Sequence, residues 1–145
     1  MKIDIIAVGR LKSGSFLELW NEYAKRLTWS VNLIEIEGRS KDEENSRLAE
    51  KLNSRAYIFI MDEKGKSLPS RDFAQRFDIL MAEGQSHIQF VLGGADGLED
   101  SVRQKADFLL SFGDQTWPHK LVRVMLIEQI YRASQIIAGH PYHRD

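Results

Sequence analysis

Residues 116–145 read TWPHKLVRVMLIEQIYRASQIIAGHPYHRD, and this carboxy-terminal stretch decides the fold. Between residues 121 and 138 apolar side chains fall on most faces of a helix, which is too apolar a pattern for a surface helix. Such a helix must be buried on two sides. We expect the sheet of the same chain to cover one side and a second copy of the chain to cover the other. A core helix within a monomer is the alternative.

The last residues differ from an ordinary chain end, which is usually small and polar. Gly139 ends the helix and Pro141 prevents it from resuming. A dense set of donors, proton carriers and an aromatic ring follows at His140, Tyr142, His143 and Arg144. This end is therefore a candidate functional segment, and a disordered tail is the alternative.

Composition indicates one globular domain, residues 1–145. The chain is 43% hydrophobic and 10% aromatic, enough for a sizeable core. No apolar run reaches transmembrane length, and the amino-terminal apolar stretch is too short for a signal peptide, so we expect a soluble cytoplasmic protein without membrane contact. The absence of cysteine excludes disulfides, thiol catalysis and Cys-based zinc sites, and the four histidines form no metal spacing, so no metal is expected.

The charge distribution bears on nucleic-acid binding. A formal net charge of −1 argues against a generally basic nucleic-acid binder. Residues 119–145, however, carry Lys120, Arg123, Arg132 and Arg144 against only two acids, while acids crowd into residues 35–50. A local basic patch along the carboxy-terminal segment is compatible with this distribution.

Strand and helix patterns alternate along the rest of the chain. β-branched and apolar runs at residues 2–8, 31–36, 56–61, 87–92 and 107–112 predict strands, and amphipathic segments at 15–27, 41–52, 70–82 and 98–106 predict helices. This alternation predicts an α/β sheet, in which ligands bind beyond the carboxyl ends of the strands. Unusual loops follow three of these ends, at residues 61–67, 93–97 and 113–118.

Two of these loops contain partial nucleotide-binding motifs. Gly65-Lys66-Ser67 matches the end of a phosphate-binding loop, but Ile60 stands where that motif needs glycine. The run Gly93-Gly94-Ala95-Asp96-Gly97 is half of a dinucleotide fingerprint, with Leu92 in place of its first glycine. Its glycines still permit positive φ and the close approach of a ligand or another backbone. A simple tight turn is the alternative.

Three separated segments together resemble a known family. LGGADG follows a strand, TWPHKLVRVMLIEQIYRA follows the last loop, and HPYHR ends the chain. In this order they resemble the RlmH family of SPOUT-class RNA methyltransferases, and the resemblance extends over essentially the whole chain, including IIAVGR and MDEKGK near its start. It implies a SPOUT-type parallel-sheet fold with helices on both faces and a carboxy-terminal trefoil knot.

The resemblance also implies an activity and a set of site residues. Family members are homodimers that bind S-adenosyl-L-methionine and methylate N3 of a pseudouridine, in the decoding-centre stem-loop of large-subunit rRNA within assembled ribosomes. The second subunit completes each active site. Carried over to this chain, the tail residues Tyr142, His143 and Arg144 are catalytic and face RNA. The cofactor contacts fall on Met61, Gly94, Gly113, Asp114, Gln115, Thr116, Trp117 and Pro118.

The chemistry of the tail agrees with methyl transfer to a ring nitrogen. The N3 proton of the uracil ring must leave, and a base or a cation that stabilises the imide anion would help. His143 is the better candidate for proton removal, because arginine stays protonated, and Arg144 is the candidate for gripping phosphate or steadying the anion. A nucleotide-binding regulatory module and a dimeric interaction protein without a ligand are the competing functions. Binding of S-adenosylmethionine would separate them from the methyltransferase.

Overall fold

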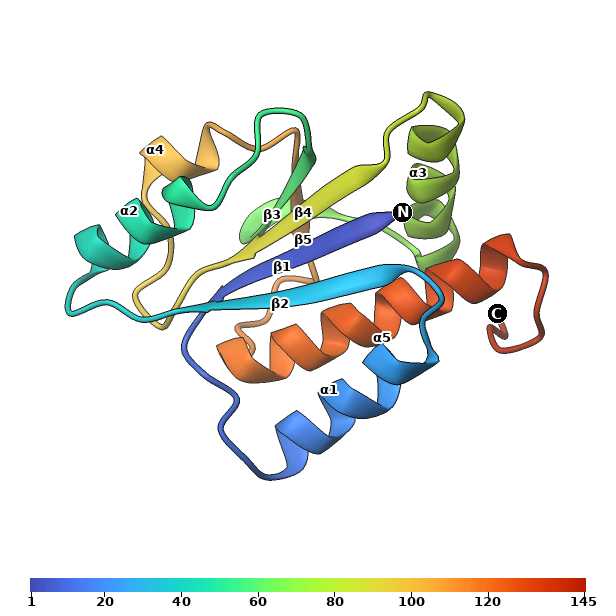
Figure 1. Ribbon diagram of the computed structural model, residues 1–145, viewed down its shortest axis with the longest axis horizontal. Coiled ribbons are helices and arrows are strands. Elements are labelled where there is room, and N and C mark those ends of the chain that lie inside the picture. Colours follow the sequence, from blue (N-terminus) through green and yellow to red (C-terminus); the bar gives the residue numbers. More distant parts are fainter.

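The computed structural model describes all of residues 1–145 and contains one sheet between two layers of helices (Figure 1). The strands are β1 (Lys2–Val8), β2 (Ser30–Ile36), β3 (Tyr57–Ser67), β4 (His87–Leu92) and β5 (Phe108–Ser111). All neighbours pair in parallel, in the order β2-β1-β4-β3-β5. The predicted α/β class with a parallel sheet is confirmed.

Helices cover both faces of the sheet, as predicted. α1 (Ser15–Arg26), α3 (Ser70–Ala82) and α5 (His119–Ile137) lie on one face, and α2 (Lys41–Glu50) and α4 (Asp100–Arg103) lie on the other (Figure 1). α4 is shorter than the predicted helix at residues 98–106, because Leu98 is buried as part of the preceding loop and the helix only begins after Glu99. The trefoil knot stays a prediction, since strand order and pairing do not define how the chain is threaded.

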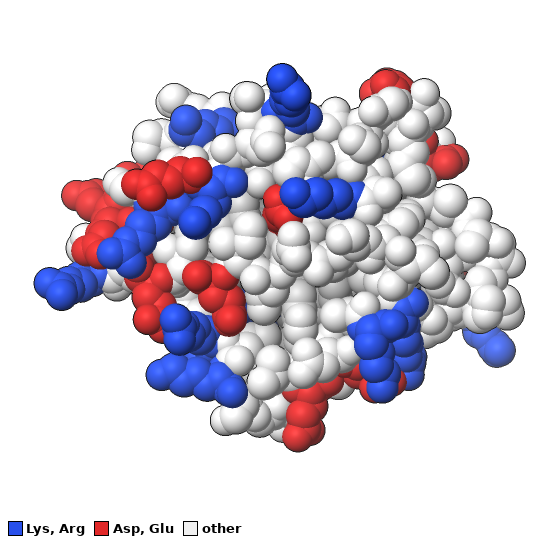
Figure 2. All heavy atoms as spheres, in the orientation of Figure 1, with Lys and Arg blue, Asp and Glu red and all other residues white.

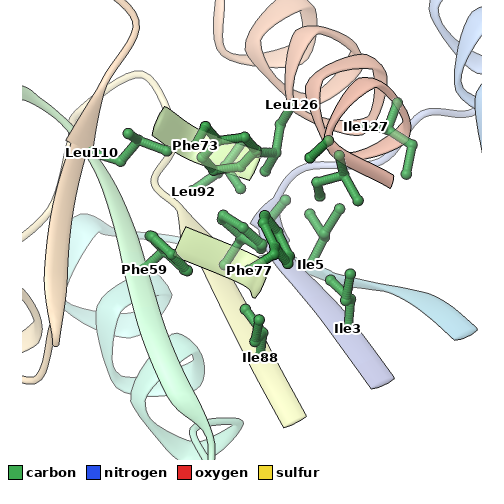
Figure 3. Close-up of a cluster of buried hydrophobic side chains, with 14 of the residues drawn as sticks. Ile3, Ile5, Phe59, Phe73, Phe77, Ile88, Leu92, Leu110, Leu126 and Ile127 are labelled. Atoms are coloured by element: carbon green, nitrogen blue, oxygen red, sulfur yellow. The ribbon is translucent and has the colours of Figure 1, made fainter. Parts of the chain in front are cut away.

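Alternate residues of the central strands fill two separate cores. Ile3 and Ile5 of β1 point towards α3 and α5, where Phe59 and Phe90 stack with their ring centroids 4.7 Å apart (Figure 3). Ile6, between them in sequence, points to the other face. A sheet that is buried on both faces needs near-continuous apolar strands, which is how these segments read in the sequence.

The long helix α5 is covered mainly by its own chain. It packs on the sheet and contacts both α1 and α3, and Ile130 at its middle is fully buried. Met125, Ile136 and Ile137 are only half-buried. One chain therefore buries much of this helix without a partner, and the apolar pattern alone does not require a second copy.

β3 continues beyond the predicted strand, with a bulge in the middle. Its pairing with β5 jumps from Met61 to Lys66, both opposite Leu110, so the residues between them leave the ladder. A Cβ on Gly65 would lie 2.7 Å from the backbone of Leu109, so only glycine allows the strand to return to β5. Gly65-Lys66-Ser67 therefore belongs to a strand and not to a phosphate-binding loop.

Candidate functional site

A cavity of about 560 Å³ opens beside the bulge of β3 and the carboxyl ends of β4 and β5. The loops after β4 and β5 form two of its walls, as the sequence predicts for a parallel sheet, whereas the third predicted loop, residues 61–67, is part of β3 and contributes its bulge. Seven of the eight predicted cofactor residues line it, namely Met61, Gly94, Gly113, Gln115, Thr116, Trp117 and Pro118. The eighth, Asp114, is exposed in the same loop and is not part of the wall. A volume of this size is typical of small-molecule sites.

The loop at residues 113–118 presents its backbone to this cavity. Gly113 has φ of 112°, and both its N–H and its carbonyl are held by the hydroxyl of Ser111, at 3.1 and 2.9 Å. Beyond it, no backbone group of residues 114–117 forms a hydrogen bond within the chain. The indole of Trp117 donates to the carbonyl of Phe112 at 3.3 Å. The loop is therefore anchored at its start and has free donors and acceptors along the cavity.

The glycine loop after β4 is a tight turn with positive φ at Gly97, and its glycines allow close approach of other parts of the chain, as expected. A Cβ on Gly94 would point at the side chain of Val8, 3.0 Å away, and at Glu44 of α2, 3.4 Å away. A Cβ on Gly93 would lie 2.9 Å from Leu98. These glycines let the loop pack closely on β1 and on its own return, which places the loop at the cavity wall. A side chain on Gly94 would first strain the fold, and only indirectly reduce the room for a ligand.

Carboxylates gather at the wall formed by the β3 bulge and the glycine loop. Asp62 is almost fully buried and accepts hydrogen bonds from the backbone N–H of Lys64, at 2.8 Å, and from Arg103 of α4. Burial alone would raise the pKa of Asp62, but these bonds and the Arg103 charge lower it overall. Asp96 lies on the same wall, and burial together with its charge raises the pKa of Glu44 nearby.

The first turn of α5 forms the opposite wall, with His119 lining the cavity. One turn further, Arg123 is fully buried and donates to the carbonyls of Val8 and Gly9, at 3.0 and 3.1 Å, and to Glu35 of β2, at 3.1 Å. Its Nε–H has no protein partner. Arg123 thereby ties the start of α5 to the end of β1. Burial, helped by the positive charges of Arg123 and Lys120, lowers the pKa of His119.

The tail is ordered, and it lies at the other end of α5. The Tyr142 hydroxyl donates to Glu128 at 3.0 Å, and its ring packs edge-on against Tyr131, with ring centroids 4.8 Å apart. Burial and the contact with Glu128 raise the pKa of Tyr142. His143 is bonded through both ring nitrogens, to Arg132 at 3.1 Å and to Asp145 at 2.9 Å. These contacts fold the tail back against the last turns of its own helix.

The structure therefore separates the two groups of residues that the sequence analysis assigned to one site. The tail folds back as far as Glu128, nine residues after His119, so at ~1.5 Å per residue ~14 Å of helix still separates the cavity wall from the nearest residue that the tail contacts. Figure 1 shows the start of α5 and the chain end marked C on opposite sides of the molecule. Within one chain, Tyr142, His143 and Arg144 do not reach the cavity.

A basic patch along the carboxy-terminal segment does not form within one chain. Arg123 is buried, Arg132 is paired with Glu128, and Lys120 and Arg144 lie at opposite ends of α5. In Figure 2 charges of both signs crowd over α2 and α4, at the left of the view, whereas the charged groups in the right half are more scattered. No helix could span a membrane, and no group of three His, Asp or Glu side chains could hold a metal ion.

Comparison with known proteins gives consistent results. The family model described as "Predicted SPOUT methyltransferase" matches residues 1–143. A "Ribosomal RNA large subunit methyltransferase H" from Rhodospirillum centenum is 47% identical over 151 residues, covering 99% of each chain. Proteins of the same name from Mesorhizobium japonicum and Zymomonas mobilis are each 44% identical over at least 99% of both chains.

The fold has a counterpart among solved structures. A probable methylase family protein from Haemophilus influenzae Rd KW20 superposes with a TM-score of 0.61, covering 99% of this chain and 70% of that one. Its sequence is only 12% identical, so this likeness concerns the fold alone.

Proposed function

The chain belongs to the ribosomal RNA large subunit methyltransferase H family of SPOUT methyltransferases, and from this premise we propose that it methylates large-subunit ribosomal RNA. The methyl donor is S-adenosyl-L-methionine, and the acceptor is N3 of a pseudouridine in the decoding-centre stem-loop of assembled ribosomes in the cytoplasm. The observation that carries the proposal is the cavity at the strand ends, whose walls contain seven of the eight predicted cofactor residues.

The cavity suits this cofactor in shape and chemistry. Met61, Leu92, Trp117 and Val122 offer apolar surface for an adenine ring, and the free backbone groups of residues 114–117 can pair with its edge. Asp114 would then take part through its backbone. When bound, the cofactor supplies a methyl group on a positively charged sulfur, and Asp62, Glu63 and Asp96 on the walls complement that charge.

The start of α5 offers the complementary feature for the cofactor's carboxylate. No side chain caps this helix, so the first N–H groups at the cavity wall are free. In the proposed orientation the cofactor's carboxylate lies near the start of α5. Its positively charged sulfur lies near the opposite wall, which the β3 bulge and the glycine loop form.

The tail can act on this cavity only from a second copy of the chain. Two α5 helices related by a two-fold axis perpendicular to them are antiparallel, and this arrangement would bring the end of one helix near the start of the other. The partner's Tyr142, His143 and Arg144 would then close the cavity and face the RNA. Because the tail is already folded in one chain, little ordering is needed when the copies associate.

A second hollow marks the surface for this association. It has a volume of about 550 Å³ and lies between α1, α3 and α5, with Leu19, Tyr23, Phe73 and Met125 among its lining residues. Leu19 is 43% exposed, and Phe16, one turn earlier on α1, is 37% exposed. We propose that this groove is the dimer interface. The alternative, a stable monomer, would leave this apolar surface in water.

The tail residues contribute different groups. Arg144 is exposed and supplies a permanent positive charge for a phosphate or for the imide anion. Tyr142 is held by Glu128 and offers its ring to a base. His143 can accept a proton only if its Nδ1 gives up the bond from Arg132. These assignments are proposals that single-residue variants can separate.

Mass spectrometry of large-subunit rRNA tests this function. We expect rRNA from cells without this protein to lack one methyl group on a pseudouridine, and the parental gene to restore it. Purified protein with S-adenosylmethionine should add the same group to ribosomes from the deficient cells. Unchanged rRNA in the deficient cells, together with no transfer in vitro, would refute the proposal.

A further inference from the structure

His119 is the one histidine of the chain that lies in the cavity, and it has no partner. Its ring nitrogens form no hydrogen bond, whereas His87 and His143 are both bonded to carboxylates. His140 is exposed near the far end of α5. The ring is half-buried, and Arg123 Nε is the one fully buried side-chain nitrogen or oxygen without a partner, so the His119 nitrogens are open to the cavity. A lone pair is therefore free inside the site.

The surroundings of His119 fix where its ring lies. Arg123, one turn along the same face of α5, binds the carbonyls of Val8 and Gly9. A Cβ on Gly9 would lie 3.8 Å from Nε2 of His119, so this ring nitrogen lies close to the end of β1. The ring thus lies between the end of β1 and the cavity, on a helix that is itself anchored.

We propose that His119 accepts the N3 proton of the target base during methyl transfer. This inference rests on the proposed function. The N3–H bond breaks and its proton moves to a ring nitrogen of His119, while the electron pair of N3 forms the new bond to the methyl carbon. The bond between that carbon and sulfur breaks, and its pair stays on sulfur.

This assignment keeps the charge of the site constant. Before transfer the positive charge is on the sulfonium, and afterwards it is on the imidazolium of His119, so Glu63 and Asp96, the wall carboxylates besides the Asp62–Arg103 pair, face one positive charge throughout. The proton goes to His119 in place of His143, the acceptor favoured by the sequence, because both nitrogens of His143 are occupied within the tail. His143 then holds the tail in shape through Arg132 and Asp145.

The charges around His119 keep its imidazole neutral near pH 7. Burial lowers its pKa, and the positive charges of Arg123 and Lys120 on the same helix act in the same direction. The charged groups on the other walls are Asp62, Glu63, Asp96 and Arg103. A neutral imidazole is the form that can take up a proton. Protonation at lower pH should therefore stop the reaction.

Single-turnover methylation kinetics of His119→Gln and the matched variant His143→Gln test this inference. The substrate is ribosomes from cells without this protein, and S-adenosylmethionine is saturating. The parental log rate should fall with slope one below the pKa of His119. An NMR titration of this ring in the full-length protein without ligands should show a pKa below 6.5 that approximates the kinetic value. His119→Gln should be about 10²- to 10⁴-fold slower and lose the slope, and His143→Gln should keep it.

The possible failures are distinct. A slope that persists in His119→Gln, or disappears only in His143→Gln, would overturn the assignment of the proton to His119 while leaving the methyltransferase intact. Equal slopes in all three proteins would overturn it as well. If the parental protein itself transfers no methyl group to these ribosomes, the proposed function fails.

Discussion

Alanine at Gly113 should weaken cofactor binding without much loss of stability. Gly113 has φ of 112°, a region that costs an L-residue about 1 to 2 kcal/mol. Nothing lies within 4 Å of the added Cβ, so the effect is one of backbone conformation alone. Residues 114–117 make no backbone hydrogen bonds, so only the two bonds between Gly113 and the Ser111 hydroxyl oppose relaxation of this loop to negative φ. The binding-competent loop then becomes a minor form, and the apparent Kd should rise about 5- to 30-fold.

Gly84→Ala is the matched control. Gly84 also has positive φ, of 84°, and open space around its Cβ, but it lies beyond α3, away from the cavity. The turn cannot relax, because the N–H groups of Gly84 and Gln85 bind carbonyls of α3. This variant should lose about 1 kcal/mol of unfolding free energy and bind cofactor normally. Calorimetry with S-adenosylmethionine and urea denaturation measure both effects. Parental affinity in Gly113→Ala would refute the role of the loop.

Two further predictions concern the proposed dimer interface and the amino-terminal ends of strands β1 and β4, opposite the cavity. Leu19→Glu should sediment as a folded monomer, because it places a charge in the groove between α1, α3 and α5. The control is Ile79→Glu, on a similarly exposed residue of α3 outside the groove, and it should leave the dimer intact. If both variants sediment as dimers, this interface is excluded. Asp4 is buried and bonded to His87 at 2.6 Å and Gln89 at 3.0 Å. Burial alone would raise the pKa of Asp4, but these bonds lower the pKa below its ordinary value of 3.8. The ionised carboxylate therefore stabilises the fold above pH 3.8, and this stabilisation is lost as the pH falls through the depressed pKa. Asp4→Asn should therefore cost about 1 to 3 kcal/mol of unfolding free energy at pH 7 and flatten the acid side of the stability curve; an unchanged acid limb in urea titrations would contradict this.

The sequence predicted the layers of the fold because its periodicity is strong. Strands buried on both faces read as continuous apolar runs, and the segments at their carboxyl ends predict where the cavity lies. The β3 bulge was missed, because the Asp62–Arg103 pair and the close approach of Gly65 to β5 depend on contacts that are distant in sequence.

The site was predicted only in part, for the same reason. His119 gave no signal of its own within the TWPH segment, because its importance depends on what surrounds it: a cavity wall and the buried Arg123 one turn away. The reason for Gly94 was also inaccessible, since only the structure places Val8 against it. The position of the cavity at the start of α5 was predictable from the loop at residues 113–118, but the contacts that fold the tail back on Glu128 and Arg132 were not.

The central claim is that the cavity of one copy works with the tail of another, and mixed dimers test it most directly. One variant, Gly113→Val, should fold and dimerise but bind cofactor more weakly than Gly113→Ala, because a β-branched residue adopts positive φ less readily, and it is assayed at a cofactor concentration far below its Kd; a second variant lacks residues 142–145. Each should be inactive alone. After random mixing, half of the dimers contain one copy of each variant. In each of these mixed dimers one of the two sites has both an intact cavity and an intact tail, so methylation of ribosomes should return to about a quarter of the parental rate. No recovery in dimers shown to have exchanged would contradict the shared site, because a tail that serves its own cavity leaves every mixed dimer inactive.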